Sequence, residues 1–198
     1  NAGQCNEYGD YMKIHRELSS ETRHLLSHLQ RNFYIIAFVR NPFHRLISCY
    51  LDKIRRPVQQ NGRYYFETRY SKHLLKRLSG IDLHPTTKFT DFIKLVTRTP
   101  DCLADGHFRS QYAFLYGRKG IRPNFIGRFE SLGQDWKVIA ERFELAPISH
   151  LNSTKTQDLL SWYKDKQTIE LVNQRYFFDI KLWYNSEYKD LLYHAKSE

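Results

Sequence analysis

The chain has 198 residues, of which 41% are hydrophobic, so it is long enough to bury a core of ordinary size. Its formal net charge of +10 favours an anionic partner, such as a nucleotide, an acidic glycan, a nucleic acid or a membrane surface. No segment approaches the roughly 20 consecutive apolar residues of a membrane-spanning helix, and no Cys-x-x-Cys pair indicates a metal site.

The first two predicted elements are a helix and a strand. Leu18, Leu25 and Leu29 recur at helical spacing and predict a helix over residues 16–30. The mostly apolar, β-prone run Phe33–Val39 then predicts a buried strand.

A sharp junction follows this strand. The strand ends at Arg40, and Asn41 and Pro42 are respectively a good N-cap and a good first residue of a helix. Apolar residues at helical spacing predict that helix over residues 42–56, with Ser48 away from the apolar stripe. Helix N-termini attract anions and the Arg40 guanidinium matches phosphate oxygens, so we expect a phosphate site here. The plainer alternative is that Arg40 forms a structural ion pair.

The run from Val39 to Tyr50, Val-Arg-Asn-Pro-Phe-His-Arg-Leu-Ile-Ser-Cys-Tyr, resembles a known motif. It is similar to the 3′-phosphate-binding motif of sulfotransferases that use 3′-phosphoadenosine 5′-phosphosulfate (PAPS), most of all the membrane-type and bacterial carbohydrate sulfotransferases. That family has a strand, then Arg-(Asp/Asn/His)-Pro, then Arg-Leu-x-Ser-x-Tyr. The resemblance implies that Arg40 and Ser48 hold the 3′-phosphate of the nucleotide.

The remaining predicted elements alternate between helix and strand. Thr90 is expected to cap a helix that runs to Thr97. A second strand is expected over Asn124–Phe129, then a helix over Leu132–Phe143 and a long last helix over residues 165–184. This alternation predicts an α/β fold with a central, mainly parallel sheet flanked by helices. The resemblance implies that it is the P-loop-NTPase-like sulfotransferase fold.

The resemblance also implies a general base. His15, in Lys-Ile-His-Arg-Glu-Leu-Ser, matches the position of the family's histidine base, and a neutral imidazole can accept a hydroxyl proton near neutral pH. His107 and Arg109, in Asp-Gly-His-Phe-Arg-Ser-Gln, match a second family motif and are expected to bind the acceptor. His107 could instead replace His15 as the base, or could only fix its loop. Glu130 is expected to anchor the turn after the second strand.

Two further features concern the nucleotide. The run Ser149–Lys155 resembles the late loop that closes over the adenosine 3′-phosphate, which implies that Ser153, Thr154 and Lys155 bind the nucleotide. The lysine-containing loop that binds the 5′-phosphosulfate in relatives is not found. We therefore expect a single sulfotransferase-like domain over residues 1–198 that lacks most of its N-terminal 5′-phosphosulfate loop region. Two explanations stay open: residues around Gly3–Tyr8 and before Asn1 are omitted from this sequence, or the chain is a truncated fragment that is not competent for transfer.

Taken together, these features predict a PAPS-dependent sulfotransferase. It would act on a hydroxyl of an acceptor, expected to be a carbohydrate, and release adenosine 3′,5′-bisphosphate, with no metal and no nucleic acid involved. The alternative is a non-catalytic basic protein that binds nucleotides, glycans or nucleic acids. A kinase-like P-loop, Gly-x-x-x-x-Gly-Lys-(Ser/Thr), does not occur. The expected location is the cytoplasm, as for a bacterial-type enzyme, or the Golgi lumen if a membrane anchor has been removed.

Overall fold

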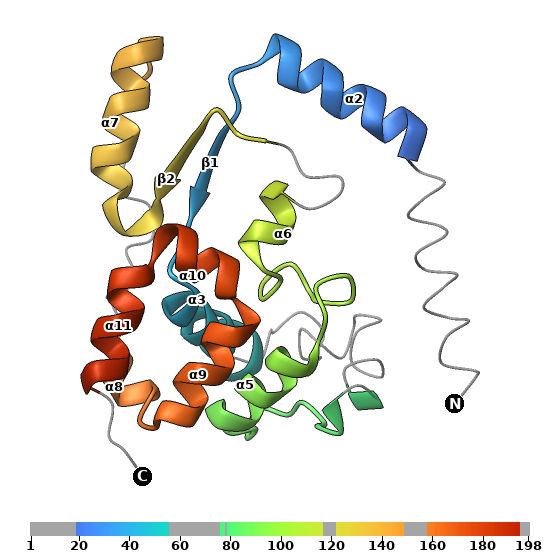
Figure 1. Ribbon diagram of the computed structural model, residues 1–198, viewed down its shortest axis with the longest axis vertical. Helices are drawn as coiled ribbons and strands as arrows, with labels where there is room; N and C mark the ends of the chain where they lie inside the picture. The colour runs from blue at the N-terminus through green and yellow to red at the C-terminus, as the bar shows by residue number, and fades with distance from the viewer. Residues whose placement is uncertain (1–18, 56–75, 78, 117–121, 149–157, 195–198) are drawn as a thin grey trace. The chain divides into compact units, whose positions relative to one another are not determined.

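The computed structural model describes residues 19–55, 76–77, 79–116, 122–148 and 158–194 (Figure 1). The chain forms two compact units, residues 1–37 with 113–126 and residues 38–112 with 127–198. Each unit is described by itself. None of the helices in these described ranges combines the length and the apolarity that crossing a membrane would require.

The first unit contains the helix α2, Ser19–Asn32, and the start of a small sheet. The helix predicted over residues 16–30 is confirmed where the structure describes it, and it ends at Asn32. The predicted strand begins only at Ile36, because the Phe33 N–H still bonds the Leu29 carbonyl at 3.0 Å and continues the last turn of α2.

Two strands, β1 (Ile36–Val39) and β2 (Phe125–Arg128), pair and run in the same direction (Figure 1). Within the first unit, Asn124 starts this pairing. Its side-chain oxygen accepts the Ile35 N–H at 2.8 Å, and its own N–H donates to the Ile35 carbonyl at 2.8 Å. The predicted parallel pairing is thus present in a small form, and the described residues form no larger sheet.

The second unit consists mainly of helices packed around one hydrophobic core. Its elements are α3 (Pro42–Cys49), the π-helix η1 (Tyr50–Arg55), α5 (Phe89–Arg98), the 3-10 helix η2 (Phe129–Ser131), α7 (Leu132–Phe143), α8 (Leu159–Trp162), α9 (Lys166–Arg175), α10 (Phe177–Trp183) and α11 (Asn185–His194). The short helix α6, Gln111–Tyr116, begins in this unit.

The core of the second unit joins α3 to the helices that follow it. The ring of Tyr163 packs edge-on against Phe43 with centroids 5.0 Å apart, and its buried hydroxyl donates to the Phe43 carbonyl at 3.0 Å. The apolar stripe predicted for α3 is confirmed, since its residues are buried or half-buried. This packing fixes α3, and with it the junction that precedes α3.

Two predicted helix starts had different outcomes. Asn41 caps α3 as predicted, because its side-chain oxygen accepts the Phe43 N–H at 2.9 Å. The helix then changes to π geometry at Tyr50, so the predicted single helix over residues 42–56 is wrong in its second half. The predicted cap at Thr90 is also wrong, since α5 begins at Phe89, whose side chain is buried in the core.

The helix predicted over Leu132–Phe143 is confirmed as α7, whereas the long helix predicted over residues 165–184 is divided. The chain leaves helical geometry at Tyr176, with φ −113° and ψ 30°. The buried hydroxyl of Tyr176 donates to the Phe108 carbonyl at 2.5 Å. Because Tyr176 is itself a core residue, the apolar periodicity continues across the break and conceals it.

Gly127 marks a close approach between β2 and its neighbours. A Cβ on Gly127 would overlap the ring of Phe38, with Cδ1 only 2.7 Å away, and would lie 3.1 Å from Cβ of Asp135. We expect Gly127→Ala to lower the free energy of unfolding by about 1–3 kcal/mol in urea titrations. Gly133→Ala in α7 is the control, because nothing lies within 4 Å of its Cβ, and it should leave stability unchanged or raise it by up to about 1 kcal/mol. Equal effects of the two substitutions would contradict this account.

Candidate functional site

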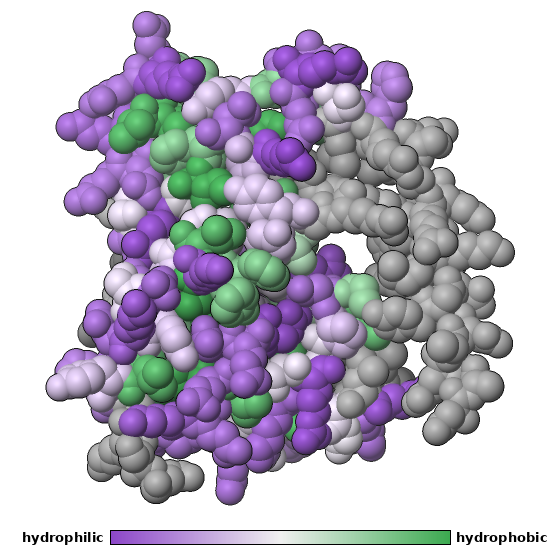
Figure 2. Space-filling model, viewed as in Figure 1, coloured by the Kyte–Doolittle hydropathy of each residue, from purple (hydrophilic) through white to green (hydrophobic). Residues whose placement is uncertain are grey.

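Hydrophilic residues cover much of the face shown in Figure 2, and the chain has 31 lysines and arginines. A solvated cation therefore does not by itself indicate a binding site. A half-buried guanidinium without a hydrogen-bond or ion-pair partner is a stronger indication, because burial of an unpaired charge is unfavourable. Arg40 fits this description.

Arg40 lies directly between β1 and α3, where the sequence predicts a phosphate site. The first turn of α3 offers fewer donors than expected, since Pro42 has no N–H and the Phe43 N–H is bonded to Asn41. The His44 N–H has no hydrogen-bond partner among the described residues. The helix start can thus contribute this amide, while most of the donors at the junction belong to Arg40.

The backbone of Arg40 is held by the side chain of Gln111. The Arg40 N–H donates to Gln111 Oε1 at 2.8 Å, and Gln111 Nε2 donates to the Arg40 carbonyl at 2.7 Å. These two bonds imitate the pairing of a neighbouring strand at the residue directly after β1. Both polar backbone atoms of Arg40 are therefore paired.

The residues on either side of Arg40 are held as well. The Asn41 N–H donates to Glu130 Oε1 at 2.8 Å. The Tyr184 hydroxyl lies 2.8 Å from Glu130 Oε2 and 3.0 Å from the Val39 carbonyl oxygen, so its one proton faces two acceptors. Burial and the Glu130 charge raise the pKa of Tyr184, which keeps this hydroxyl protonated. Three consecutive backbone units are therefore tied to distant parts of the sequence.

The prediction that Glu130 anchors the turn after β2 is wrong. Asp135 holds that turn, because its Oδ2 accepts the Arg128 N–H at 2.5 Å and the Ser131 hydroxyl at 2.9 Å. Asp135 lies in the first turn of α7, from which its short side chain reaches back to the strand end. Glu130 instead anchors the junction between β1 and α3.

The guanidinium group of Arg40, unlike its backbone, makes no hydrogen bond or ion pair with the part of the chain that the structure describes. It lies 5.0 Å from the ring centroid of Phe129. Burial lowers the pKa of Arg40 and the Glu130 carboxylate opposes this shift, and the group stays charged at neutral pH. Both oxygens of Glu130 are bonded elsewhere, so a bound anion would supply the missing partner.

Ser48 and His44 lie one turn apart on α3, and both are half-buried. Neither side chain has a hydrogen-bond partner among the residues that the structure describes. Burial lowers the pKa of His44, the Glu130 carboxylate opposes this shift and Arg40 adds to it. His44 is therefore neutral at pH 7, and Arg40 supplies the charge at this end of α3. A joint role of Arg40 and Ser48 stays a prediction.

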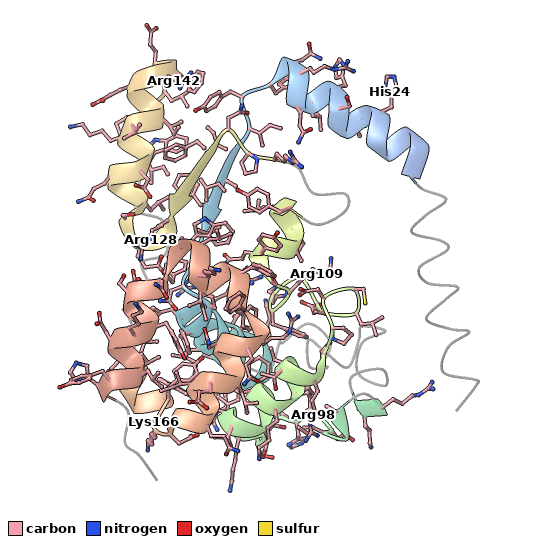
Figure 3. The ribbon with its side chains drawn as sticks, viewed as in Figure 1. His24, Arg98, Arg109, Arg128, Arg142 and Lys166 are labelled. Carbon is pink, nitrogen blue, oxygen red and sulfur yellow. The ribbon has the colours of Figure 1, made fainter. Side chains whose placement is uncertain are left out.

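His107 and Arg109 lie in the loop between α5 and α6, and Figure 3 labels Arg109 there. His107 Nδ1 is 2.5 Å from Oδ1 of Asp105, which also accepts the His107 N–H at 2.9 Å. Arg109 donates from Nε and Nη2 to the Ala104 carbonyl at 3.1 and 2.8 Å. Arg45 of α3 donates to the Arg109 carbonyl at 2.5 Å, so α3 holds this loop. The contacts fit a loop-fixing role and leave acceptor binding and base catalysis as predictions.

The start of α6, and therefore Gln111, is held by Asp179 of α10. Asp179 is fully buried and accepts the Gln111 N–H at 2.9 Å, the Tyr112 N–H at 2.7 Å and the Ser110 hydroxyl at 3.0 Å. Burial raises the pKa of Asp179, and the three hydrogen bonds oppose this shift. This carboxylate thus connects α10 to the residue that holds Arg40.

Four predicted site residues, His15, Ser153, Thr154 and Lys155, lie outside the described residues. Their placement relative to Arg40 therefore stays predicted from the sequence. Within the described ranges, no group of histidine, cysteine, aspartate or glutamate side chains is arranged to hold a metal ion.

Sequence reasoning did not identify Gln111, Asp179 and Tyr184 as parts of the site. Gln111 had a signal, since it ends the motif that also contains His107. Asp179 and Tyr184 had none, because they occur within what the sequence predicts to be an uninterrupted amphipathic helix.

Comparisons with known proteins agree with the motif at this junction. A family model described as "Sulfotransferase family" matches residues 3–185. Carbohydrate sulfotransferase 14 of Danio rerio is 31% identical over 144 residues, which cover 70% of this chain and 36% of that protein. Carbohydrate sulfotransferase 12 of Xenopus laevis is 26% identical over 172 residues, which cover 77% of this chain and 40% of that protein. The chain thus spans about two fifths of the length of these curated relatives. No solved structure matches it significantly.

Proposed function

Since the chain belongs to the sulfotransferase family, we propose that it transfers a sulfuryl group from PAPS to a hydroxyl group of a carbohydrate. The observation that carries this proposal is the half-buried Arg40 guanidinium, which has no hydrogen-bond or ion-pair partner among the described residues although the backbone around it is held. The names of the two relatives, both carbohydrate sulfotransferases, support a carbohydrate acceptor. We retain residues 1–198 as a single sulfotransferase-like domain as part of the proposal.

Arg40 and Ser48 are the proposed ligands of the nucleotide 3′-phosphate. A guanidinium group can donate two parallel hydrogen bonds to phosphate oxygens, and a serine hydroxyl can donate a third. Ser153, Thr154 and Lys155 are proposed to close over the same phosphate. PAPS supplies the sulfuryl group and leaves as adenosine 3′,5′-bisphosphate.

His15 is the proposed general base. As the acceptor oxygen attacks sulfur, the hydroxyl proton passes to the neutral imidazole, which avoids a charged oxonium on the acceptor. His107 is the second candidate, because the Asp105 carboxylate at its Nδ1 would stabilise the protonated ring.

The cellular location stays a proposal. Both relatives come from vertebrates, so the bacterial-type cytoplasmic prediction receives no support from them. We therefore favour the alternative already considered, in which this sequence acts on carbohydrate in the Golgi lumen.

The proposal is tested by thermal unfolding with adenosine 3′,5′-bisphosphate. A ligand that binds only the folded state raises Tm, and at 100 times its Kd the expected increase is about 5–10 °C for a chain of this size. ATP, which has no 3′-phosphate, and inorganic phosphate should raise Tm by less than half of that amount.

The outcome separates the two functional candidates. Equal shifts with all three ligands would contradict a 3′-phosphate site and favour the non-catalytic basic binder. Binding by that protein should also weaken steeply with salt, because it would depend on many solvated cations rather than on one half-buried arginine.

A further inference from the structure

Gln111 occupies an unusual position beside the proposed phosphate site. Val39 is the last residue of β1, so Arg40 is not a member of the strand ladder. Both polar backbone atoms of Arg40 are nevertheless paired, and one side-chain amide pairs them both, at 2.8 and 2.7 Å. An amide that donates and accepts at the same residue leaves the peptide groups beside that residue little freedom to rotate.

We propose that Gln111 is a positioning residue, which sets the direction of the Arg40 side chain so that the guanidinium faces the nucleotide 3′-phosphate. This inference rests on the proposed function. In the described contacts the Gln111 amide bonds the Arg40 backbone and not its guanidinium, so any effect on the guanidinium is exerted through that backbone.

Asp179 is the anchor that gives Gln111 its own fixed position. Gln111 and Tyr112 begin α6, and both of their N–H groups donate to the buried Asp179 carboxylate. The backbone from which the Gln111 side chain extends is therefore tied to α10. The path from core to site runs from Asp179 to the Gln111 backbone, along its side chain, and to the Arg40 backbone.

Other hydrogen bonds also hold the junction between β1 and α3. The proposed positioning role of Gln111 can therefore be tested apart from any contribution of Gln111 to folding stability. Tyr184 holds the Val39 carbonyl and Glu130 holds the Asn41 N–H, and neither contact involves Gln111. Loss of the Gln111 amide should therefore leave β1 and α3 in place. What changes is the orientation of the Arg40 backbone between them.

The test uses two substitutions of Gln111 and calorimetric titration with adenosine 3′,5′-bisphosphate. Gln111→Met keeps the length of the side chain but removes both hydrogen bonds, and we expect Kd to rise about tenfold at pH 5.5 and at pH 8. Gln111→Glu keeps the acceptor for the Arg40 N–H. At pH 8 its ionised carboxylate faces the Arg40 carbonyl oxygen, and Kd should again rise about tenfold or more.

At pH 5.5 the two variants should differ. A carboxyl group that faces the Arg40 carbonyl oxygen is favoured in its protonated form, because two acceptors would otherwise face each other, and the protonated form can both donate and accept. Lower pH should therefore move the Kd of Gln111→Glu toward the wild-type Kd measured at the same pH, whereas Gln111→Met should show no such recovery. The titratable and charged groups of the described residues around this position are Arg40, His44 and Arg45 near β1 and α3, Asp179 of α10, Tyr184, and Glu130 after β2. They are the same in all the proteins compared. Gln174→Glu, at an exposed position of α9, is the control for the added charge.

The outcomes are distinguishable. If the wild-type chain does not bind adenosine 3′,5′-bisphosphate, the proposed function fails. If it binds and Gln111→Met binds equally well, the proposed function stands and the positioning role is overturned. Loss of cooperative unfolding in both Gln111 variants would also overturn it, because the amide would then hold the fold rather than orient Arg40.

Discussion

Arg40→Ala is expected to weaken the binding of adenosine 3′,5′-bisphosphate severely. Removal of one partner from a half-buried, hydrogen-bonded charge pair costs about 2–5 kcal/mol of binding free energy, which raises Kd about 30-fold or more. Stability should change little, because the guanidinium has no hydrogen bond or ion pair in the described structure and its burial is unfavourable, which offsets the loss of its contact with the Phe129 ring. Isothermal titration gives Kd, and urea unfolding gives stability on the same protein.

Two further variants make this result specific. Arg40→Lys keeps the charge but loses the planar pair of donors, so its Kd should lie between those of the wild type and Arg40→Ala. Arg142→Ala removes an exposed arginine near the end of α7 and should leave Kd unchanged (Figure 3). If Arg40→Ala binds normally but unfolds more easily, Arg40 forms the structural ion pair instead, and the proposed phosphate site is wrong.

The junction that carries Arg40 was predictable because its signals are local. An apolar run, an arginine and an Asn-Pro pair lie within ten residues of one another, and they determine a strand, a cap and a helix start without help from the rest of the chain. The structure confirms the cap at Asn41 and the apolar stripe of α3.

The residues that hold this junction were not predictable in the same way. Gln111 bonds Arg40 across 71 positions, and Tyr184 approaches Val39 across 145 positions. No periodicity or capping rule connects residues so far apart. Sequence patterns therefore identified the residue proposed to bind the anion and missed those proposed to orient it.

The boundary between α9 and α10 was also not predictable from local sequence patterns. Periodicity detects which residues face the core, so it continues from α9 into α10 through the buried Tyr176. The break at Tyr176 depends on a tertiary hydrogen bond to the Phe108 carbonyl, which the local sequence does not contain. Because of this break, Asp179 belongs to a separate helix, α10, rather than to a continuation of α9. A model with one straight helix over these residues would therefore misplace the carboxylate that anchors Gln111.

His15→Ala is expected to remove sulfuryl transfer while it preserves nucleotide binding. A positioned general base contributes about 10²–10⁴-fold to the rate, so single-turnover transfer from PAPS to an acceptor carbohydrate should slow by that factor. The Kd for adenosine 3′,5′-bisphosphate should stay within about twofold of the wild type, because the proposed phosphate ligands are untouched. His24→Ala, at an exposed position of α2, is the matched control and should change neither quantity (Figure 3).

His107→Ala decides between the two candidate bases. If His15 is the base, His107→Ala should slow transfer mainly by loosening the loop that Asp105 and Arg45 hold. His107→Asn restores a side-chain hydrogen bond to Asp105, so this variant should recover most of the wild-type transfer rate. If His107 is the base, neither replacement can accept the hydroxyl proton and both should slow transfer equally. Normal transfer by His15→Ala together with loss in both His107 variants would move the base to the loop between α5 and α6, with Asp105 as the group that stabilises the protonated ring.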